Sequence, residues 1–179
     1  MDLAPILAAS LPLLGWTTHG TYLARRLATA RRDPLTGLLT RDGFTTRAER
    51  LIRSHPDRTT VLLIDLDDFK AINDTHGHAT GDAVLKATAD RLTDWCGPSG
   101  LVARLGGDEF AAVALDATHR LPGLTAALRQ PVELGGLVLD VSASVGISHP
   151  AALLLTEALS AADRDMYAHK PGSRTSRRR

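Results

Sequence analysis

Two clusters of carboxylates are the residues of this chain best suited to chemistry. Asp65, Asp67 and Asp68 close an apolar run, and Asp108 and Glu109 follow two glycines. Carboxylates this close repel one another unless a cation lies between them, and oxygen ligands suit Mg²⁺, which enzymes often share with substrate phosphates. The clusters therefore predict a Mg²⁺ site, although aspartates in turns are also common as plain solvated residues.

The composition limits the class of protein. The chain has 179 residues, of which 44% are hydrophobic, enough for one domain with a sizeable core. Its one cysteine, Cys96, excludes an internal disulfide framework and a cysteine-rich zinc site, and it favours a reducing, intracellular setting. Aromatic residues make up only 4%, which argues against base stacking on single-stranded nucleic acid.

The formal net charge of +1 hides two basic ends and an acidic middle. Residues 1–32 carry a net charge of +3, residues 33–169 carry −7, and residues 170–179 carry +5. An acidic middle suits divalent metal ions better than a nucleic-acid surface. We therefore expect no nucleic-acid partner.

The carboxylates must be positioned by a mixture of strands and helices. Apolar, β-branched residues predict a buried strand that ends beside the first cluster, and paired glycines between two apolar runs predict a β-hairpin that carries the second. Together they predict an α+β fold, with one sheet and helices on its faces. The expected strands are Thr59–Leu66, 101–105, 110–115, Val132–Leu134 and 137–148; the expected helices are 40–55 with Thr40 as N-cap, 69–73, Thr80 or Asp82 to 95, 124–130 and 153–170.

The first segment is apolar enough to be considered as a membrane anchor. Residues 3–24 have the length of a span, and the two arginines that follow would stay on the cytoplasmic side. Prolines and a histidine interrupt the run, so a plain helical extension fits as well. We divide the chain into this segment with a lead-in helix (1–32), a domain (33–170) and a basic tail (171–179).

Six segments resemble the motifs of one protein family. They are DPLTGL at 33–38, DLDDFKAIND at 65–74, GHATGD at 77–82, GGDEF at 106–110, VSASVGIS at 141–148 and ADRDMYAHK at 162–170. Their order and spacing are similar to those of the GGDEF-domain diguanylate cyclases. The resemblance implies a nucleotidyl-cyclase-like, ferredoxin-like palm: a central, mostly antiparallel sheet flanked by helices, with GGDEF on a β-hairpin.

The resemblance implies an activity and a metal site. Family members condense two GTP molecules into cyclic di-GMP and two pyrophosphates, each 3′-hydroxyl attacking the α-phosphate of the other GTP. The side chains of Asp65 and Asp108 and the carbonyl of Leu66 would hold Mg²⁺, or Mn²⁺. Asp108 would also accept the proton, Glu109 would support metal or hydroxyl activation, and Lys70 would stabilise phosphate charge. Glu109 also fits a simple turn carboxylate.

The resemblance also assigns contacts to the nucleotide. Asn73 and Asp82 match the positions that read guanine, and His78 lies near the nucleotide; Asp82 also fits the cap of the helix that follows it. Gly106 and Gly107 would let the backbone turn tightly and the nucleotide approach closely.

Two further segments concern phosphate binding and inhibition by the product. Lys170 and Arg174 match the basic pair that contacts the terminal phosphates, but Pro171 would end the helix between them. Many family members carry an RxxD motif before the hairpin, which binds the product for feedback inhibition. The corresponding residues here are Gly97, Pro98, Ser99 and Gly100, so we expect no product inhibition through this turn.

The expected partners follow from this reaction. Each protomer would hold one GTP, so catalysis needs a homodimer that brings two half-sites face to face. The catalytic domain would be cytoplasmic, at the inner face of the cell membrane if residues 3–24 form an anchor. Two alternatives remain: a catalytically silent module that binds GTP or cyclic di-GMP, and a small membrane-linked interaction protein.

Overall fold

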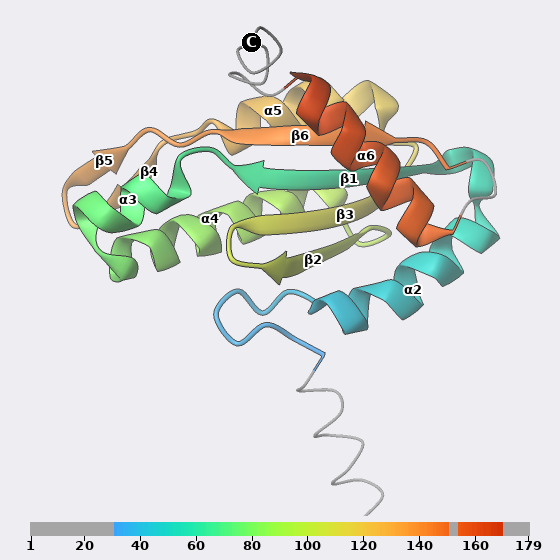
Figure 1. Cartoon of the computed structure of the whole chain (residues 1–179), viewed down its shortest axis with the longest axis horizontal. Helices are drawn as coiled ribbons and strands as arrows, with labels where there is room; N and C mark the ends of the chain where they lie inside the picture. Colours follow the sequence, from blue (N-terminus) through green and yellow to red (C-terminus); the bar gives the residue numbers. More distant parts are fainter. Residues whose placement is uncertain (1–30, 151–153, 170–179) are drawn as a thin grey trace, which may run out of the picture.

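The central element is a four-stranded antiparallel sheet (Figure 1). The structure, a computed structural model, describes residues 31–150 and 154–169. The strand order is β2-β3-β1-β6, with β1 at Thr59–Leu66, β2 at Leu101–Gly106, β3 at Glu109–Leu115 and β6 at Ala143–Ser148. A separate hairpin pairs β4 (Val132–Leu134) with β5 (Leu137–Leu139). The expected α+β fold with an antiparallel sheet is confirmed.

Helices cover both faces of this sheet. One face packs against α4 and α5, and the opposite face packs against α2 and α6, while α3 lies at one end beside α4 (Figure 1). The helices span α2 Arg41–Ser54, α3 Phe69–His76, α4 His78–Cys96, α5 Leu121–Leu128 and α6 Leu155–His169, with 3₁₀ turns at Pro56–Arg58 and Thr118–Arg120.

The strand β1 is buried on both faces, which explains its unbroken apolar run. Leu62 and Ile64 belong to the cluster beneath α4 and α5, whereas Val61 and Leu63 pack on the α2 and α6 side. A strand covered on both faces reads as a continuous hydrophobic segment rather than an alternating one. The predicted bounds of β1 are confirmed.

The helix α2 begins as predicted. The Thr40 Oγ1 accepts a hydrogen bond from the Gly43 N–H over 3.4 Å, and this satisfies an otherwise unpaired donor of the first turn. Phe44, Ala48 and Ile52, spaced four residues apart, are buried along one stripe. This stripe packs α2 onto the sheet.

The strand expected over 137–148 is wrong, because it is interrupted at 140–142. Gly135 and Gly136 both have positive φ and turn β5 back along β4, whereas β6 pairs with β1. The two halves have different partners, so no continuous strand runs through 140–142.

The expected start of α4 at Thr80 or Asp82 is also wrong. The helix begins at His78, directly after Gly77, whose φ of 83° separates it from α3. Similarly, α3 continues to His76, and α5 begins at Leu121, earlier than expected. The connections that precede α4 and α5 are therefore shorter than the sequence predicts.

Several expectations concern residues that the structure does not describe. These are the possible anchor at 3–24, the lead-in helix up to residue 30, Lys170, Arg174 and the tail. Residues 31 and 32 were also expected to belong to the lead-in helix, and this is wrong, because residue 31 lies in a turn and Arg32 forms a β-bridge with Leu39. Across 31–150 and 154–169, no helix combines the length and apolar character needed to cross a bilayer.

Candidate active site

One end of the central sheet brings the two carboxylate clusters together. In β1, Asp65 stands opposite Glu109 of β3 on one side and Ser144 of β6 on the other. Residues paired in this way project from the same face of a sheet, with Cβ atoms about 5 Å apart. The Leu66 N–H also donates to the Asp108 carbonyl over 3.3 Å. The structure therefore joins the residues assigned to the metal site.

The donor atoms at this end fit Mg²⁺. Asp65 and Asp108 are half-buried, and Glu109 is exposed. Mg²⁺ commonly takes only one or two carboxylates and completes its shell with water and substrate phosphates. Within the described ranges, no group of three or more His, Cys, Asp or Glu side chains forms a metal cage. Two carboxylates with the Leu66 carbonyl thus suit an ion that is shared with a phosphate substrate.

The GGDEF turn depends on its glycines for their backbone conformation. The φ angles of Gly106 and Gly107 are 151° and 52°, which residues with side chains rarely adopt. The pairing of β2 with β3 is irregular between Arg104 and Gly106. No atom lies within 4 Å of a Cβ built at either glycine, so the turn faces open space where a nucleotide has room to approach.

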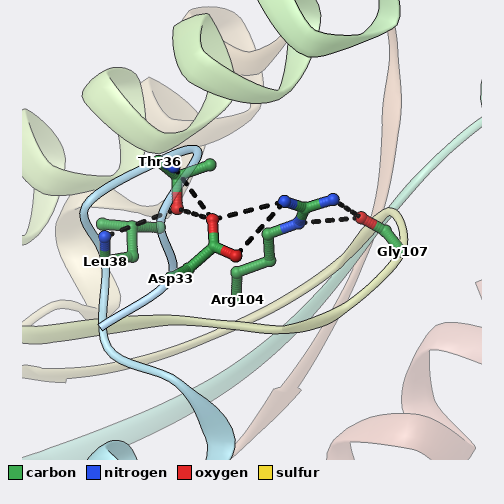
Figure 2. A network of polar contacts seen from close by, with 5 residues as sticks. All are labelled: Asp33, Thr36, Leu38, Arg104 and Gly107. Carbon is green, nitrogen blue, oxygen red and sulfur yellow. Dashed lines mark hydrogen bonds and ion pairs between the residues drawn. The ribbon is translucent and has the colours of Figure 1, made fainter. Parts of the chain in front are cut away.

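Arg104 fastens the GGDEF turn to the DPLTGL segment (Figure 2). Its Nε and Nη2 donate to the Gly107 carbonyl over 2.9 and 2.8 Å, and its Nη1 lies 3.2 Å from Asp33 Oδ1. The side chains of Arg104 and Asp33 are only 15% and 18% exposed. A guanidinium that bridges a carboxylate and a carbonyl fixes both groups in direction as well as distance.

Asp33 is held ionised by its surroundings. The Thr36 N–H and Oγ1 donate to Asp33 Oδ1 over 2.9 and 2.7 Å. Burial alone would raise the pKa of Asp33, but the hydrogen bonds from Thr36 and the neighbouring Arg104 bring it below its usual value. The charge of Asp33 therefore supports Arg104 at neutral pH.

Asp33 and Arg104 are not among the site residues predicted from the sequence. Both lie in segments that resemble the family, and Arg104 is the charged residue in the otherwise apolar run LVARL. A charged residue in a strand that packs on its neighbours needs a partner. The arginine within this apolar run is therefore the sequence feature that could have predicted a buried ion pair.

The first acidic cluster divides into different roles. Asp67 accepts hydrogen bonds from the Ser142 and Ser144 hydroxyls, both over 2.7 Å, and its N–H donates to the Ser142 carbonyl. It thereby fastens the start of β6 to the end of β1. Asp68 has a φ of 53° and precedes α3 as its N-cap residue. Both are structural in this arrangement, while Asp65 lies on the sheet beside Glu109.

The contact between α3 and α4 positions Asn73. A Cβ built on the buried Gly81 would overlap Asn73 Oδ1, so the glycine of GHATGD makes room for this side chain. Asp82 is exposed within α4, whose N-cap residue is Gly77; the alternative that Asp82 caps the helix is therefore wrong. His78 is exposed and is the first residue of α4, so it lies where α4 follows α3.

Two exposed cations lie near the acidic end. Lys70 Nζ is 3.3 Å from Asp74 Oδ2, and Arg41 Nη2 is 4.0 Å from Glu109 Oε2. Exposed ion pairs of this kind contribute little energy, so either cation can turn toward a bound phosphate at small cost. Arg41 is not among the site residues predicted from the sequence.

The turn before β2 has no room for an RxxD motif in its present backbone. Gly97 has a φ of 67°, and a Cβ on Gly100 would lie 2.7 Å from the Cys96 Cβ. An arginine at the first position would be strained, and an aspartate at the last would collide. The backbone of this turn therefore disfavours the two residues of the RxxD motif that the sequence lacks.

Comparison with known proteins identifies the family. A family model described as "Diguanylate cyclase, GGDEF domain" matches residues 30–176. The chain belongs to this family. The GGDEF domain covers the whole of the described structure, including the Asp33–Arg104 bridge and the hairpin.

Relatives of this GGDEF domain include both short and long proteins. An uncharacterized 19.3 kDa protein in the repSA 5′ region of Streptomyces ambofaciens is 58% identical over 172 residues, 93% of each chain. Diguanylate cyclase TpbB of Pseudomonas aeruginosa is 40% identical over 166 residues, which are 83% of this chain but only 37% of TpbB. The chain thus spans little more than a third of that curated relative.

A solved relative has a similar fold. The coiled coil and GGDEF domain of DgcB from Caulobacter crescentus, in complex with c-di-GMP, is 25% identical and superposes with a TM-score of 0.74 over 94% of each chain. This likeness supports the fold and extends over nearly the full length of both.

Proposed function

We propose that this protein is a diguanylate cyclase, which condenses two GTP molecules into cyclic di-GMP and two pyrophosphates. The proposal is carried by the meeting of Asp65, Leu66 and Asp108 at one end of the sheet, beside an open glycine turn. The likeness to TpbB, which is a diguanylate cyclase, and to DgcB, solved with c-di-GMP, supports it.

The residues at this end of the sheet have different roles in the proposed phosphoryl transfer. Mg²⁺ held by Asp65, Asp108 and the Leu66 carbonyl would neutralise phosphate charge and lower the pKa of the attacking hydroxyl. Asp108 accepts the proton of the 3′-hydroxyl, and Lys70 turns from Asp74 to the phosphates. Arg104 keeps the Gly107 carbonyl, and with it the turn that presents Asp108, in one position.

In this proposal, guanine is recognised by residues of α3 and α4. Asn73 and Asp82 offer an amide and a carboxylate, which together can accept from and donate to the guanine edge. A site built on such bonds rejects adenine, because its polar groups would then lose their partners. Lys170 and Arg174 complete the proposed site at the terminal phosphates.

The reaction requires two copies of the chain. Each GGDEF domain holds one GTP, and each hydroxyl must reach the other α-phosphate in line. A two-fold homodimer satisfies both requirements with identical half-sites. Since the turn at 97–100 lacks the RxxD pair, product would not inhibit through that turn.

Turnover of GTP by the full chain tests this proposal. With Mg²⁺, the wild-type protein should form cyclic di-GMP, and Asp108→Asn should lower the rate about 10²-fold or more, because proton acceptor and metal ligand are lost together. Asp94→Asn, on an exposed part of α4, is the matched control and should retain the wild-type rate. Equal activity of Asp108→Asn would overturn the assignment, and GTP binding without product by dimeric wild type would favour the silent module.

A further inference from the structure

A basic groove lies between α2 and the turn at 97–100, away from the GGDEF turn. It consists of two adjoining cavities of about 220 and 330 Å³, which share Arg47, Gly100 and Leu101 in their walls. The larger cavity reaches the lower limit of small-molecule sites. The strand β2 separates Leu101 from the GGDEF turn by roughly 16 Å, at about 3.3 Å per residue. The groove is therefore a different site from the one already described.

The charged side chains along this groove are all basic. Arg32 lines the smaller cavity, Arg50 the larger and Arg47 both, and no described aspartate or glutamate lines either one. On the same helix, Arg53 pairs with Glu49 over 3.7 Å. Within residues 31–150 and 154–169, neither Arg47 nor Arg50 pairs with a carboxylate. Their positive charge is therefore available to an anion.

His55 lines the larger cavity and carries a buried, unsatisfied ring nitrogen. The Nδ1 of His55 is buried and has no hydrogen-bond partner among the described residues. The backbone of His55 is fixed, because its N–H donates to Leu51 and its carbonyl accepts from Thr59 Oγ1. A buried ring nitrogen without a partner costs free energy, which a ligand oxygen would recover.

The groove favours a terminal phosphate over a phosphodiester. A terminal phosphate or diphosphate carries more charge per group than a diester, and guanidinium groups bind it through paired, charge-assisted hydrogen bonds. A cyclic dinucleotide presents only singly charged diesters, and the turn at 97–100 offers it neither arginine nor aspartate. We propose that Arg47, Arg50 and His55 form a binding site for the terminal phosphate or diphosphate group of a small anion.

Binding of inorganic pyrophosphate to the full chain tests this site without catalysis. The titration is followed by calorimetry and by the unfolding midpoint, without divalent metal and at an ionic strength matched with potassium chloride. Wild type should bind saturably and unfold at higher temperature with ligand. R47A/R50A should bind at least tenfold more weakly, because both guanidinium groups are lost. R47Q/R50Q keeps the side-chain stems and should show the same loss, which separates charge from packing on α2.

Two control variants locate the binding. Arg53→Ala removes a basic residue of the same helix that lies outside the groove, and Lys86→Ala removes an exposed one on α4; both should bind pyrophosphate like wild type. Cyclic di-GMP should bind more weakly than pyrophosphate. The proposal is overturned by the absence of saturable binding, by wild-type affinity in both double variants, by an equal loss of binding in Arg53→Ala or Lys86→Ala, or by tighter binding of cyclic di-GMP.

Discussion

Arg104 is the residue that most directly holds the GGDEF turn in place. It makes two hydrogen bonds to the Gly107 carbonyl and an ion pair with Asp33, and all three need the planar fork of a guanidinium. A lysine at this position keeps the charge but can serve only one partner well. The turn would then lose a fixed position relative to Asp65 without loss of the metal ligands themselves.

Arg104→Lys should therefore lower kcat for cyclic di-GMP formation by about tenfold or more, with a smaller change in KM. Arg58→Lys is the matched control, because Arg58 also forms an ion pair with an aspartate, Asp116, but at the far end of β1. The control should keep the wild-type kcat. An unchanged kcat in Arg104→Lys would show that the bridge to Gly107 does not position the turn.

Asp33 makes stability depend on pH in a defined direction. Its pKa is lower in the folded state, so its ionised form stabilises the fold above the unfolded-state pKa of about 4. That stabilisation is lost as pH falls through the lower, folded-state pKa. The free energy of unfolding of wild type should exceed that of Asp33→Asn at pH 7, and the difference should shrink below about pH 4. Urea titrations across this range measure it, and a constant difference would contradict the argument.

Substitution of Gly81 tests whether Asn73 must keep its present position to bind GTP. A methyl group in Gly81→Ala would overlap Asn73 Oδ1 and displace the amide proposed to read guanine. KM for GTP should rise about tenfold, the effect of losing one or two hydrogen bonds to the base. Gly123→Ala, where a Cβ meets no atom within 4 Å, is the control and should leave KM unchanged. An unaltered KM in Gly81→Ala would remove Asn73 from the guanine site.

At the scale of elements, α6 lies against β6 because Gly146 has no side chain. A Cβ at this position would overlap the Ala162 carbonyl oxygen and crowd the Met166 Cβ, so the helix could not stay at its present distance. Gly146→Ala should lower the free energy of unfolding by about 1–3 kcal/mol, as overpacking does. In contrast, Gly123→Ala in α5 should be neutral or stabilising by a few tenths of a kcal/mol. A Gly146→Ala protein as stable as wild type in urea would contradict this contact.

The sequence predicted most elements because their signals were local. The unbroken apolar run of β1 and the Thr40 cap of α2 needed no tertiary information. The break at 140–142 was missed because it depends on which strand each half pairs with. The start of α4 was missed because Gly77, with its positive φ, begins the helix with no side-chain cap.

The sequence named the residues that are proposed to hold the metal ion, but not the contacts that position them. Asp65, Leu66 and Asp108 were named from motifs, and the sheet brings them together. The bridge from Asp33 through Arg104 to Gly107 joins segments far apart in sequence, and no local pattern marks such a pair. Likewise, the structural role of Asp67 depends on Ser142 and Ser144 of a distant strand.

At the scale of the whole molecule, the proposed reaction gives each GGDEF domain one half-site. The acidic sheet end, the α3–α4 end and the end of α6 surround a single nucleotide in this proposal, so the second reacting GTP must come from another copy. An acidic domain that binds a polyanion also needs its metal ion, and removal of divalent cations should abolish turnover.

Whether this chain condenses GTP is decided by the ratio of the products that the full chain forms from GTP with Mg²⁺. Cyclic di-GMP is quantified by chromatography and pyrophosphate by an enzyme-coupled assay in the same reaction. We expect two pyrophosphates to be released for each cyclic di-GMP, and the specific activity to rise with protein concentration as dimers form. Pyrophosphate release without cyclic di-GMP, or no release from protein shown to be dimeric, would contradict this expectation.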